Sequence, residues 1–247
     1  MAGATEPARH ARHLALPQLG ETGQRRIGSG TALLIGVGGI GCAAASYLAS
    51  SGVGRLQLCD FDTVDATNLG RQILFGPDDI GKPKAELAAR RLRAINPDIR
   101  IDAIGARLEG DALSAAVSGA DVVLDGSDNF ATRFAVSDAC VAAGRTLVSG
   151  AAIRLEGQLA VFGPDYDRSP CYRCLYQEAD ESLESCAGNG VLAPVPGAIG
   201  ALIAAEALKS LAGIGATRGV LQLYDALNGD LRSIRIEKNP RCEACAA

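Results

Sequence analysis

The chain has no tryptophan, and aromatic residues make up only 4% of its 247 residues. So few aromatic side chains leave little surface on which nucleic-acid bases could stack. The net charge of −4 also leaves no basic surplus for binding a phosphate backbone. Both absences argue against a nucleic-acid partner.

Long apolar runs are lacking too. Polar or charged residues interrupt every apolar stretch before the roughly eighteen residues that a membrane-spanning helix needs. The N-terminal sequence MAGATEPARHARHLALPQLG also lacks the apolar core of a secretory signal. We therefore expect a cytoplasmic protein with no membrane partner, whose eight cysteines are metal ligands or reactive thiols rather than disulfides.

Glycine and short apolar segments, in contrast, are abundant. An apolar fraction of 48% and 30 glycines suit a buried parallel sheet with tight turns. The patterns predict helices at residues 39–52 and 84–95, and strands at residues 31–36, 55–60, 99–104, 120–129 and 146–151. Repeated units of this kind predict an α/β fold with a Rossmann-like, doubly wound, mostly parallel sheet.

The pattern changes near residue 150. Strands are predicted at residues 157–163, 219–226 and 231–237 with few helices between them, which indicates antiparallel additions to the sheet. A polar segment at residues 163–190 is long enough to be either functional or disordered. An apolar helix is expected at residues 197–211, and one domain over the whole chain is the simplest organisation.

A glycine-rich turn, GVGGIG, follows the first predicted strand and opens the first predicted helix. Its glycines, Gly36, Gly38, Gly39 and Gly41, allow a tight turn and a close approach of the backbone to a phosphate or sugar. A structural turn without a ligand is the alternative. The motif alone does not separate NAD from ATP.

Asp60 ends the second predicted strand and lies 19 residues after Gly41. Dinucleotide-binding folds place at this point the carboxylate that accepts hydrogen bonds from the ribose hydroxyls. An acid that only caps a turn is the alternative.

More polar residues follow at the expected carboxyl ends of neighbouring strands: Asp62, Asn68, Arg71, Gln72, Lys84, Asp128 and Asn129. Singly, the basic residues would most often be solvated surface charges. Together they suit a triphosphate better than the diphosphate of a dinucleotide, and an acid beside phosphates suits Mg²⁺. The set favours ATP over two alternatives, an NAD-dependent oxidoreductase, which would need a hydride-transfer constellation, and a non-catalytic scaffold.

Six segments in order resemble the HesA/MoeB/ThiF family of ubiquitin-activating-like adenylyltransferases. They are residues 36–72, GKPKAE, SDN, LVSGAAIRLEGQ, PCYRCL and NPRCEAC. The likeness extends from Arg9 to Cys245 and is greatest for the molybdopterin-synthase branch, with the thiamine-pathway branch a near relative. The resemblance implies ATP-dependent adenylylation of the C-terminal glycine of a small ubiquitin-like sulfur carrier that ends in Gly-Gly, in molybdenum cofactor biosynthesis.

The resemblance also implies roles for single residues. Gly39 would lie against the nucleotide, Asp60 would hold the ribose, and Asp128 would hold Mg²⁺. The triphosphate would be contacted by Asn68, Arg71 and Lys84. The single domain, residues 1–247, would divide into a helical N-terminal segment, a nucleotide-binding half and a carrier-binding half: residues 1–28, 29–150 and 151–247.

In this family the N-terminal segment supplies an arginine to the active site of the partner subunit, and Arg12 stands at that position. We therefore expect a homodimer with shared sites. His10 and His13 stand where relatives have tyrosine and glutamine, so a solvated basic tail is the alternative for Arg12.

Four cysteines form two pairs, each presenting two thiolates on a tight knuckle. They are expected to make a structural zinc site: Cys171, Cys174, Cys242 and Cys245. Redox pairs or idle thiols are the alternatives. Cys186 lies where relatives with a covalent carrier–enzyme bond keep a cysteine, with an inert thiol as the alternative. The remaining three are expected to be small core residues: Cys42, Cys59 and Cys140. No rhodanese-like extension follows the last pair, so sulfur would come from a separate donor protein.

Overall fold

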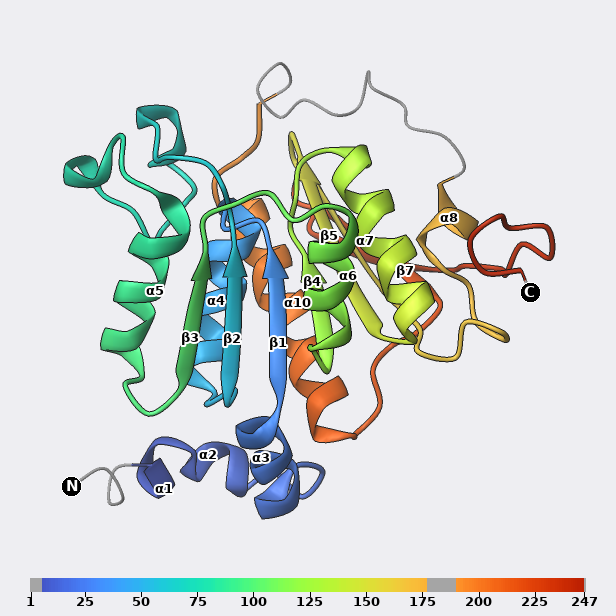
Figure 1. Ribbon diagram of the computed structural model, residues 1–247, viewed down its shortest axis with the longest axis horizontal. Coiled ribbons are helices and arrows are strands. Elements are labelled where there is room, and N and C mark those ends of the chain that lie inside the picture. The colour runs from blue at the N-terminus through green and yellow to red at the C-terminus, as the bar shows by residue number, and fades with distance from the viewer. Residues whose placement is uncertain (1–5, 177–189, 247) are drawn as a thin grey trace.

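One twisted sheet lies between two layers of helices in the computed structural model, which describes residues 6–176 and 190–246 (Figure 1). The strand order is β3-β2-β1-β4-β5-β6-β7-β8. The first five strands in this order pair in parallel, and β6, β7 and β8 add in antiparallel fashion. The predicted doubly wound sheet with antiparallel additions is confirmed.

The strands are β1 (Thr31–Ile35), β2 (Arg55–Cys59), β3 (Arg100–Ile104), β4 (Val122–Asp125), β5 (Thr146–Ile153), β6 (Glu156–Phe162), β7 (Val220–Asp225) and β8 (Asp230–Arg235). The helices of the first half are α1 (Glu6–Arg9), α2 (Ala11–Leu14), α3 (Gly20–Ser29), α4 (Gly39–Ser50), α5 (Lys84–Ile95), α6 (Gly110–Ser118) and α7 (Phe130–Ala143). The second half holds α8 (Tyr172–Leu175) and α10 (Pro194–Ala212), and two 3₁₀ turns, η1 (Ala66–Asn68) and η2 (Pro77–Asp79), follow β2. The predicted helices correspond to α4, α5 and α10, while α6 and α7 complete the βα units.

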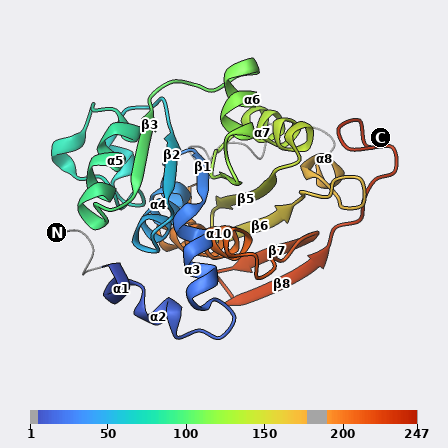
Figure 2. The same ribbon diagram turned by 60° about the horizontal axis from the view of Figure 1, so that its bottom comes forward.

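Each central strand is buried on both faces. In β1, Ala32 and Leu34 pack into a core shared with α4, α5 and α10, whereas Leu33 and Ile35 pack into a second core with α6 and α7. Figure 2 shows these two helical layers on opposite sides of the sheet. Burial on both faces is why this strand reads as a continuous apolar run rather than an alternating one.

Helix α10 is the central helix of one layer. By length and composition it is the one described helix that could cross a membrane, but half of its apolar stretch is buried inside the protein. A Cβ added at Gly200 would lie 2.3 Å from the carbonyl oxygen of Ile40, so α10 and α4 are in backbone contact. At its end, buried Glu206 accepts hydrogen bonds from Lys209 (2.7 Å) and from the Thr217 backbone (2.8 Å).

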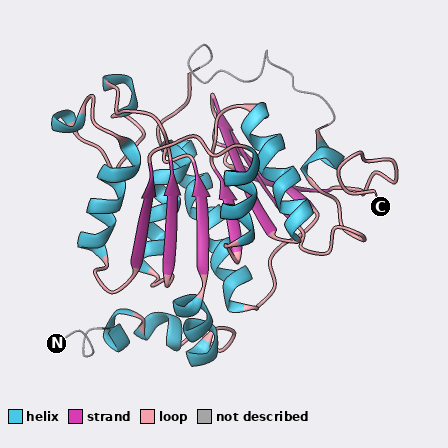
Figure 3. Ribbon diagram, viewed as in Figure 1, coloured by secondary structure: helices cyan, strands magenta, loops and turns pink. Residues whose placement is uncertain are grey.

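The amino ends and the carboxyl ends of the parallel strands lie in different surroundings. Helices α1, α2 and α3 lie beyond the amino ends of the strands, at the bottom of the view in Figures 1 and 3. The carboxyl ends of β1, β2 and β4 lie at the opposite edge of the sheet. Doubly wound folds bind their ligands at that edge, where the strand order reverses beside β1.

Candidate active site

A cavity opens at the carboxyl ends of β1, β2 and β4. Ten of the residues proposed from sequence line it: Gly36, Gly38, Gly39, Asp60, Asp62, Arg71, Gln72, Lys84, Asp128 and Asn129. Two others lie behind this lining, Gly41 in the glycine turn and Asn68 in η1. Cys186 is outside the described residues.

The glycine turn after β1 brings backbone donors to the cavity. Gly36 has a φ of 85°, and a Cβ at Gly41 would lie only 2.0 Å from the carbonyl oxygen of Gly36. No side chain caps α4 at Gly38, and its first turn holds no acid. The first N–H groups of this helix are therefore available to an anion in the cavity.

Asp60 links this turn to the loop after β2. One carboxylate oxygen accepts from the backbone N–H of Val37 at 2.7 Å, and the other accepts from that of Asp62 at 2.9 Å. Burial raises the pKa of Asp60, while these two hydrogen bonds and the charge of Lys84 oppose the rise. Asp60 is thus a turn-capping acid, yet each oxygen keeps a lone pair with which a ribose hydroxyl could bond.

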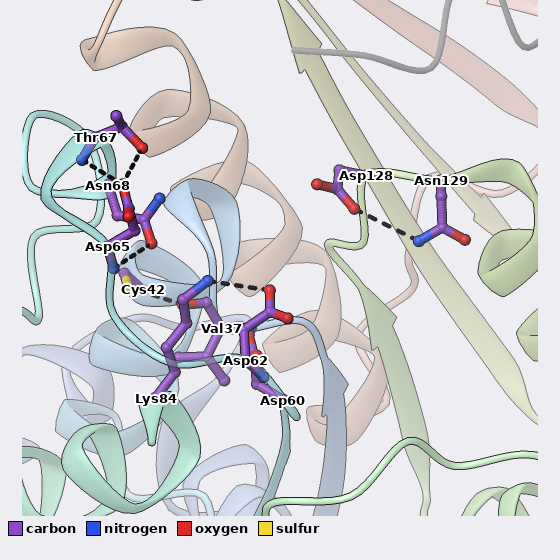
Figure 4. Close-up of polar contacts among 10 residues, drawn as sticks. All are labelled: Val37, Cys42, Asp60, Asp62, Asp65, Thr67, Asn68, Lys84, Asp128 and Asn129. Atoms are coloured by element: carbon purple, nitrogen blue, oxygen red, sulfur yellow. Dashed lines mark hydrogen bonds and ion pairs between the residues drawn. The ribbon is translucent and has the colours of Figure 1, made fainter. Parts of the chain in front are cut away.

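Lys84 is the buried cation of the same wall, with 6% of its surface exposed. Its ammonium lies 3.2 Å from the carboxylate of Asp62, and its backbone N–H donates to the carbonyl of Asp62 at 3.0 Å. Figure 4 shows this pair beside Asp60. The contacts fix Lys84 at the start of α5, on the edge of the cavity.

The η1 turn and the residues that follow it hold the other polar residues of this wall. The buried amide of Asn68 accepts from the Asp65 backbone at 3.1 Å, closing a capping box. The guanidinium of Arg71 donates to the carbonyl of Thr67 at 2.8 Å. Gln72 is buried, and its Oε1 has no hydrogen-bond partner among the described residues. Arg71 and Gln72 line the cavity, whereas Asn68 orders the turn that carries them.

A second wall comes from the loop after β4. Asp128 is exposed, and its contact with Asn129 Nδ2 is long, at 3.5 Å. Asn129 caps α7 by accepting from the Thr132 backbone at 2.9 Å. Figure 4 shows Asp128 and Asn129 apart from the Asp60 and Lys84 group. An exposed carboxylate with so little contact is available to a cation such as Mg²⁺.

Sequence reasoning missed three residues that also line the cavity. Phe61 is about half exposed, and the guanidinium carbon of Arg107 lies 4.6 Å from the centre of its ring. Arg133, from α7, donates to the carbonyl of Ser127 at 2.8 Å. Single aromatic and basic residues outside a motif give no signal in a sequence. The tertiary fold brings them to the site.

Arg12 lies away from this cavity. It is exposed on α2, beyond the amino ends of the strands, whereas the cavity is at their carboxyl ends (Figure 1). Its neighbour His10 is buried against Gly52, and His13 bonds to Gln24 at 2.9 Å. The two histidines therefore anchor this segment to its own chain.

The two cysteine pairs meet as expected from their spacing. Their four sulfur atoms lie within 4.8 Å of one another. The sulfur–sulfur distance is 3.5 Å from Cys174 to Cys245, 3.6 Å from Cys171 to Cys242 and 3.9 Å from Cys171 to Cys174. Tetrahedral Zn–S bonds of about 2.3 Å require sulfur atoms about 3.8 Å apart. The donor set and its geometry fit zinc. Lys238 places its ammonium 3.2 Å from the sulfur of Cys245, which would offset the negative charge of four thiolates.

Three single cysteines are buried, which confirms that they belong to the core. Burial raises the pKa of Cys42 to about 12 and that of Cys59 to about 11. It raises the pKa of Cys140 as well. These thiols stay protonated at neutral pH and are poor nucleophiles.

Comparison with known proteins decides the family. The sequence model of the ThiF family matches residues 10–244. The chain belongs to the ThiF family. It is 44% identical over 241 residues to the molybdopterin-synthase adenylyltransferase of Escherichia coli, covering 97% of this chain and 96% of that protein. It is 42% identical over 237 residues to the sulfur carrier protein ThiS adenylyltransferase of the same organism, covering 96% and 94%.

Further relatives agree with this assignment. The sulfur carrier protein adenylyltransferase of Thermus thermophilus is 42% identical over 243 residues, 96% of this chain and 90% of that protein. Among solved structures, E. coli MccB with MccA-N7isoASN superimposes with a TM-score of 0.80 at 25% identity, covering 92% of this chain and 70% of that one. This ThiF-family chain is therefore an enzyme of the nucleotidyltransferase class with a Rossmann-type sheet.

Proposed function

We propose that this enzyme uses ATP and Mg²⁺ to adenylylate the C-terminal glycine of a small ubiquitin-like sulfur carrier ending in Gly-Gly. The products are an acyl-adenylate and pyrophosphate, and the adenylate then becomes a thiocarboxylate with sulfur from a separate donor protein. We place the reaction in molybdenum cofactor biosynthesis, in the cytoplasm. The carrier would be of the type of the small subunit of molybdopterin synthase.

One observation carries the ATP assignment: the two walls of the cavity have complementary charges. A ribose-type acid, Asp60, lies next to the uncapped start of α4 and to the cations Lys84 and Arg71. On the other wall, Asp128 has an exposed carboxylate. A triphosphate needs several positive groups together with an acid that can hold its metal ion. An NAD-dependent oxidoreductase would need neither the acid Asp128 nor the cations Lys84 and Arg71.

The reaction requires the protein to position the reactants and to neutralise charge, and it requires no proton transfer. The glycine carboxylate is already ionised at neutral pH, so it can attack the α-phosphorus of ATP without a general base. One oxygen of the glycine carboxylate forms a bond to the α-phosphorus. The bond between the α-phosphorus and the oxygen that bridges to the β-phosphate breaks, and pyrophosphate leaves with that oxygen. Lys84, Arg71 and the N–H groups of α4 would offset the charge that grows on the departing pyrophosphate.

Mg²⁺, held by Asp128, would add charge neutralisation at the phosphates. In this proposal Asn68 acts through η1, by fixing the turn that presents Arg71. Phe61, Leu108 and Val136 offer an apolar surface for the adenine base. The work of these residues is to bind and orient the nucleotide.

Zinc would be held by the four clustered cysteines as a structural ion. Cys171 and Cys174 belong to the segment after β6, and Cys242 and Cys245 to the C-terminal segment. The ion would join these two segments through its bonds to sulfur. Nothing in the chemistry above needs it at the cavity.

We further propose a homodimer in which Arg12 completes the site of the partner subunit. Arg12 cannot serve its own cavity, because the two lie at opposite edges of the sheet. An arginine from a second chain would add to the positive charge around the triphosphate, as arginine fingers do.

The test is ATP–pyrophosphate exchange with purified carriers. Exchange that depends on a molybdopterin-type carrier with an intact Gly-Gly end is expected, whereas a carrier lacking the last glycine should give none. Exchange with the thiamine-pathway carrier alone would assign the enzyme to the thiamine pathway. Binding of NAD in preference to Mg²⁺ and ATP would overturn the proposal altogether.

A further inference from the structure

Lys238, in the segment after β8, is a half-buried cation that forms no ion pair with a carboxylate in the described part of the chain. Its ammonium donates to the carbonyl of Tyr166 at 2.6 Å and to that of Cys245 at 2.8 Å. The third contact is with the sulfur of Cys245, at 3.2 Å. An ammonium group has three N–H donors, so these acceptors use all of them.

Arg173, a second cation beside the cysteines, is already neutralised. It lies between Cys171 and Cys174 in the sequence and forms two hydrogen bonds of 2.7 Å with the carboxylate of Asp138. Four thiolates around one Zn²⁺ would leave two excess negative charges on the cluster. Of the two cations, Lys238 is the one whose charge remains for the sulfur atoms.

Lys238 also ties the last cysteine to the loop after β6. Tyr166 of that loop is buried, and its hydroxyl donates to the carbonyl of Arg145 at 2.8 Å. The carbonyls of Tyr166 and Cys245 accept from the same ammonium. The position of Cys245 is therefore set by contacts within the protein, as is common for residues that hold a metal ligand from behind.

Cys174 and Cys245 accept hydrogen bonds of different kinds. The sulfur of Cys174 accepts from the backbone N–H of Asn239, a neutral donor, at 3.4 Å. The sulfur of Cys245 accepts from the charged ammonium of Lys238. Charge-assisted hydrogen bonds are about twice as strong as neutral ones, and hydrogen bonds to metal-bound sulfur change its electron donation to the metal. Lys238 is thus able to act on the charge of the cluster as well as on its shape.

We propose that Lys238 is a positioning residue of the cysteine cluster, which fixes Cys245 for metal binding and offsets one excess negative charge of the zinc-loaded cluster. The inference rests on the zinc site of the proposed function and adds the residue that decides how firmly the ion is held. Lys238 touches no residue of the nucleotide cavity. Without its ammonium, the sulfur and two carbonyls would lose a charged donor.

Competition for zinc with a chromophoric chelator tests the effect on metal binding. Lys238→Met keeps the length of the side chain and removes the ammonium. Its zinc affinity should be about 10- to 100-fold lower, the range for loss of a group that orients a metal ligand. The matched control is Arg241→Met, which removes an exposed cation of the same segment; its affinity should change by less than about twofold, because exposed charges are screened. No loss in Lys238→Met, or an equal loss in the control, would overturn the proposal.

Replacement of zinc by Co²⁺ gives a readout that a general loosening of the fold would not move. Charge-transfer absorption from sulfur to Co²⁺ should shift to longer wavelength in Lys238→Met, because a sulfur atom without the ammonium gives up an electron more readily. Lys238→Arg, which keeps the charge and the donors, should stay nearer to wild type. Lys238→Gln takes the place of Lys238→Met if that variant does not fold, with the same expected shift. Weaker binding with an unchanged absorption band would mean a structural role only and would overturn the charge effect.

The same measurements separate this inference from the zinc assignment. A wild type that binds neither Zn²⁺ nor Co²⁺ would refute the zinc site and the role of Lys238 together. Normal binding of both ions, with no difference between wild type and Lys238→Met, would refute the role of Lys238 alone. Neither readout uses ATP or a carrier, so both are independent of adenylylation.

Discussion

The parallel and antiparallel halves of the sheet are stabilised in different ways. In β1 four of five residues are buried between two helical layers, whereas all six residues of β8 are exposed at the edge of the sheet. The segment after β8 ends instead at the cysteine cluster, which ties it to α8. The comparison teaches that the strands inside the sheet rest on apolar cores, including antiparallel β6 with five of its seven residues buried, whereas the segment beyond the exposed edge strand β8 is held at the cysteine cluster. Replacing a functional group at the parallel strands should therefore leave stability unchanged, whereas replacing a cysteine of the cluster should lower it.

The largest effect is expected where the first half exposes a functional group. Asp128→Ala should reduce carrier-dependent pyrophosphate exchange by about a hundredfold or more, since a charge-stabilising group of the transition state is lost. Its melting temperature should stay unchanged, because Asp128 is exposed and weakly bonded. Asp111→Ala, which removes an exposed acid of α6 outside the cavity, is the control and should keep full activity. Robust exchange by Asp128→Ala would refute the magnesium assignment.

A mixing experiment asks whether the nucleotide half is complete within one chain. Arg12→Ala and Asp128→Ala should each be inactive as homodimers. After subunit exchange, each heterodimer would hold one intact site, so random mixing should restore about a quarter of wild-type activity if sites are shared. No recovery, with exchange verified by mass spectrometry, would show that Arg12 does not act in the site of the partner subunit.

The cysteine cluster provides the opposite test, of groups whose loss should lower stability. Cys174→Ser should lower the bound zinc from about one ion per chain and reduce the melting temperature by about 5 °C, the change that roughly 2 kcal/mol gives in a chain of this size. Cys140→Ser removes a buried thiol that is not a ligand, and it should keep the zinc. A metal-free wild type of equal stability would mean that the cysteine pairs serve another purpose.

The smallest effect concerns pH and the buried Asp125. Burial raises its pKa, opposed by the charge of Arg133 and by hydrogen bonding from Ser127 and Ser149. A raised carboxyl pKa gives stability that is full below the ordinary carboxyl pKa and is lost as pH rises through the folded value. The free energy of unfolding of wild type should therefore fall, relative to Asp125→Asn, as pH rises above about 4. Parallel pH curves for the two proteins would contradict a shifted Asp125.

Much of the nucleotide half was predictable because its signals are local. The run at residues 31–35, the glycines after it and the acid at the end of β2 lie in one continuous stretch, so spacing alone locates the turn and Asp60. Lys84 and Asp128 were found for a related reason, since Lys84 opens α5 and Asp128 follows β4, two elements whose patterns are plain. The cysteine pairs were found because a two-residue spacing is itself a metal-knuckle signature.

The remaining site residues could not be found in this way. Arg133 stands within α7 with no flanking motif, and Phe61 and Arg107 are 46 positions apart in the chain. Asn68 stays a predicted phosphate ligand, and the fold adds that its side-chain oxygen closes a capping box at η1, a contact that its position in the sequence does not reveal. Contacts between residues distant in sequence depend on how the elements pack, which single-chain patterns do not encode.

The sequence by itself determined the class of the sheet, the glycine turn, the acid at the end of β2 and the two cysteine pairs, because short-range sterics and periodic burial dictate them. Only the tertiary structure decided that Asp60 and Asp128 occupy separate walls of the cavity, and that Arg12 lies at the far edge of the sheet. The physical reason is the parallel topology. It gathers the carboxyl ends of strands that are distant in the chain at one edge, and the helices between them determine which side chains meet there.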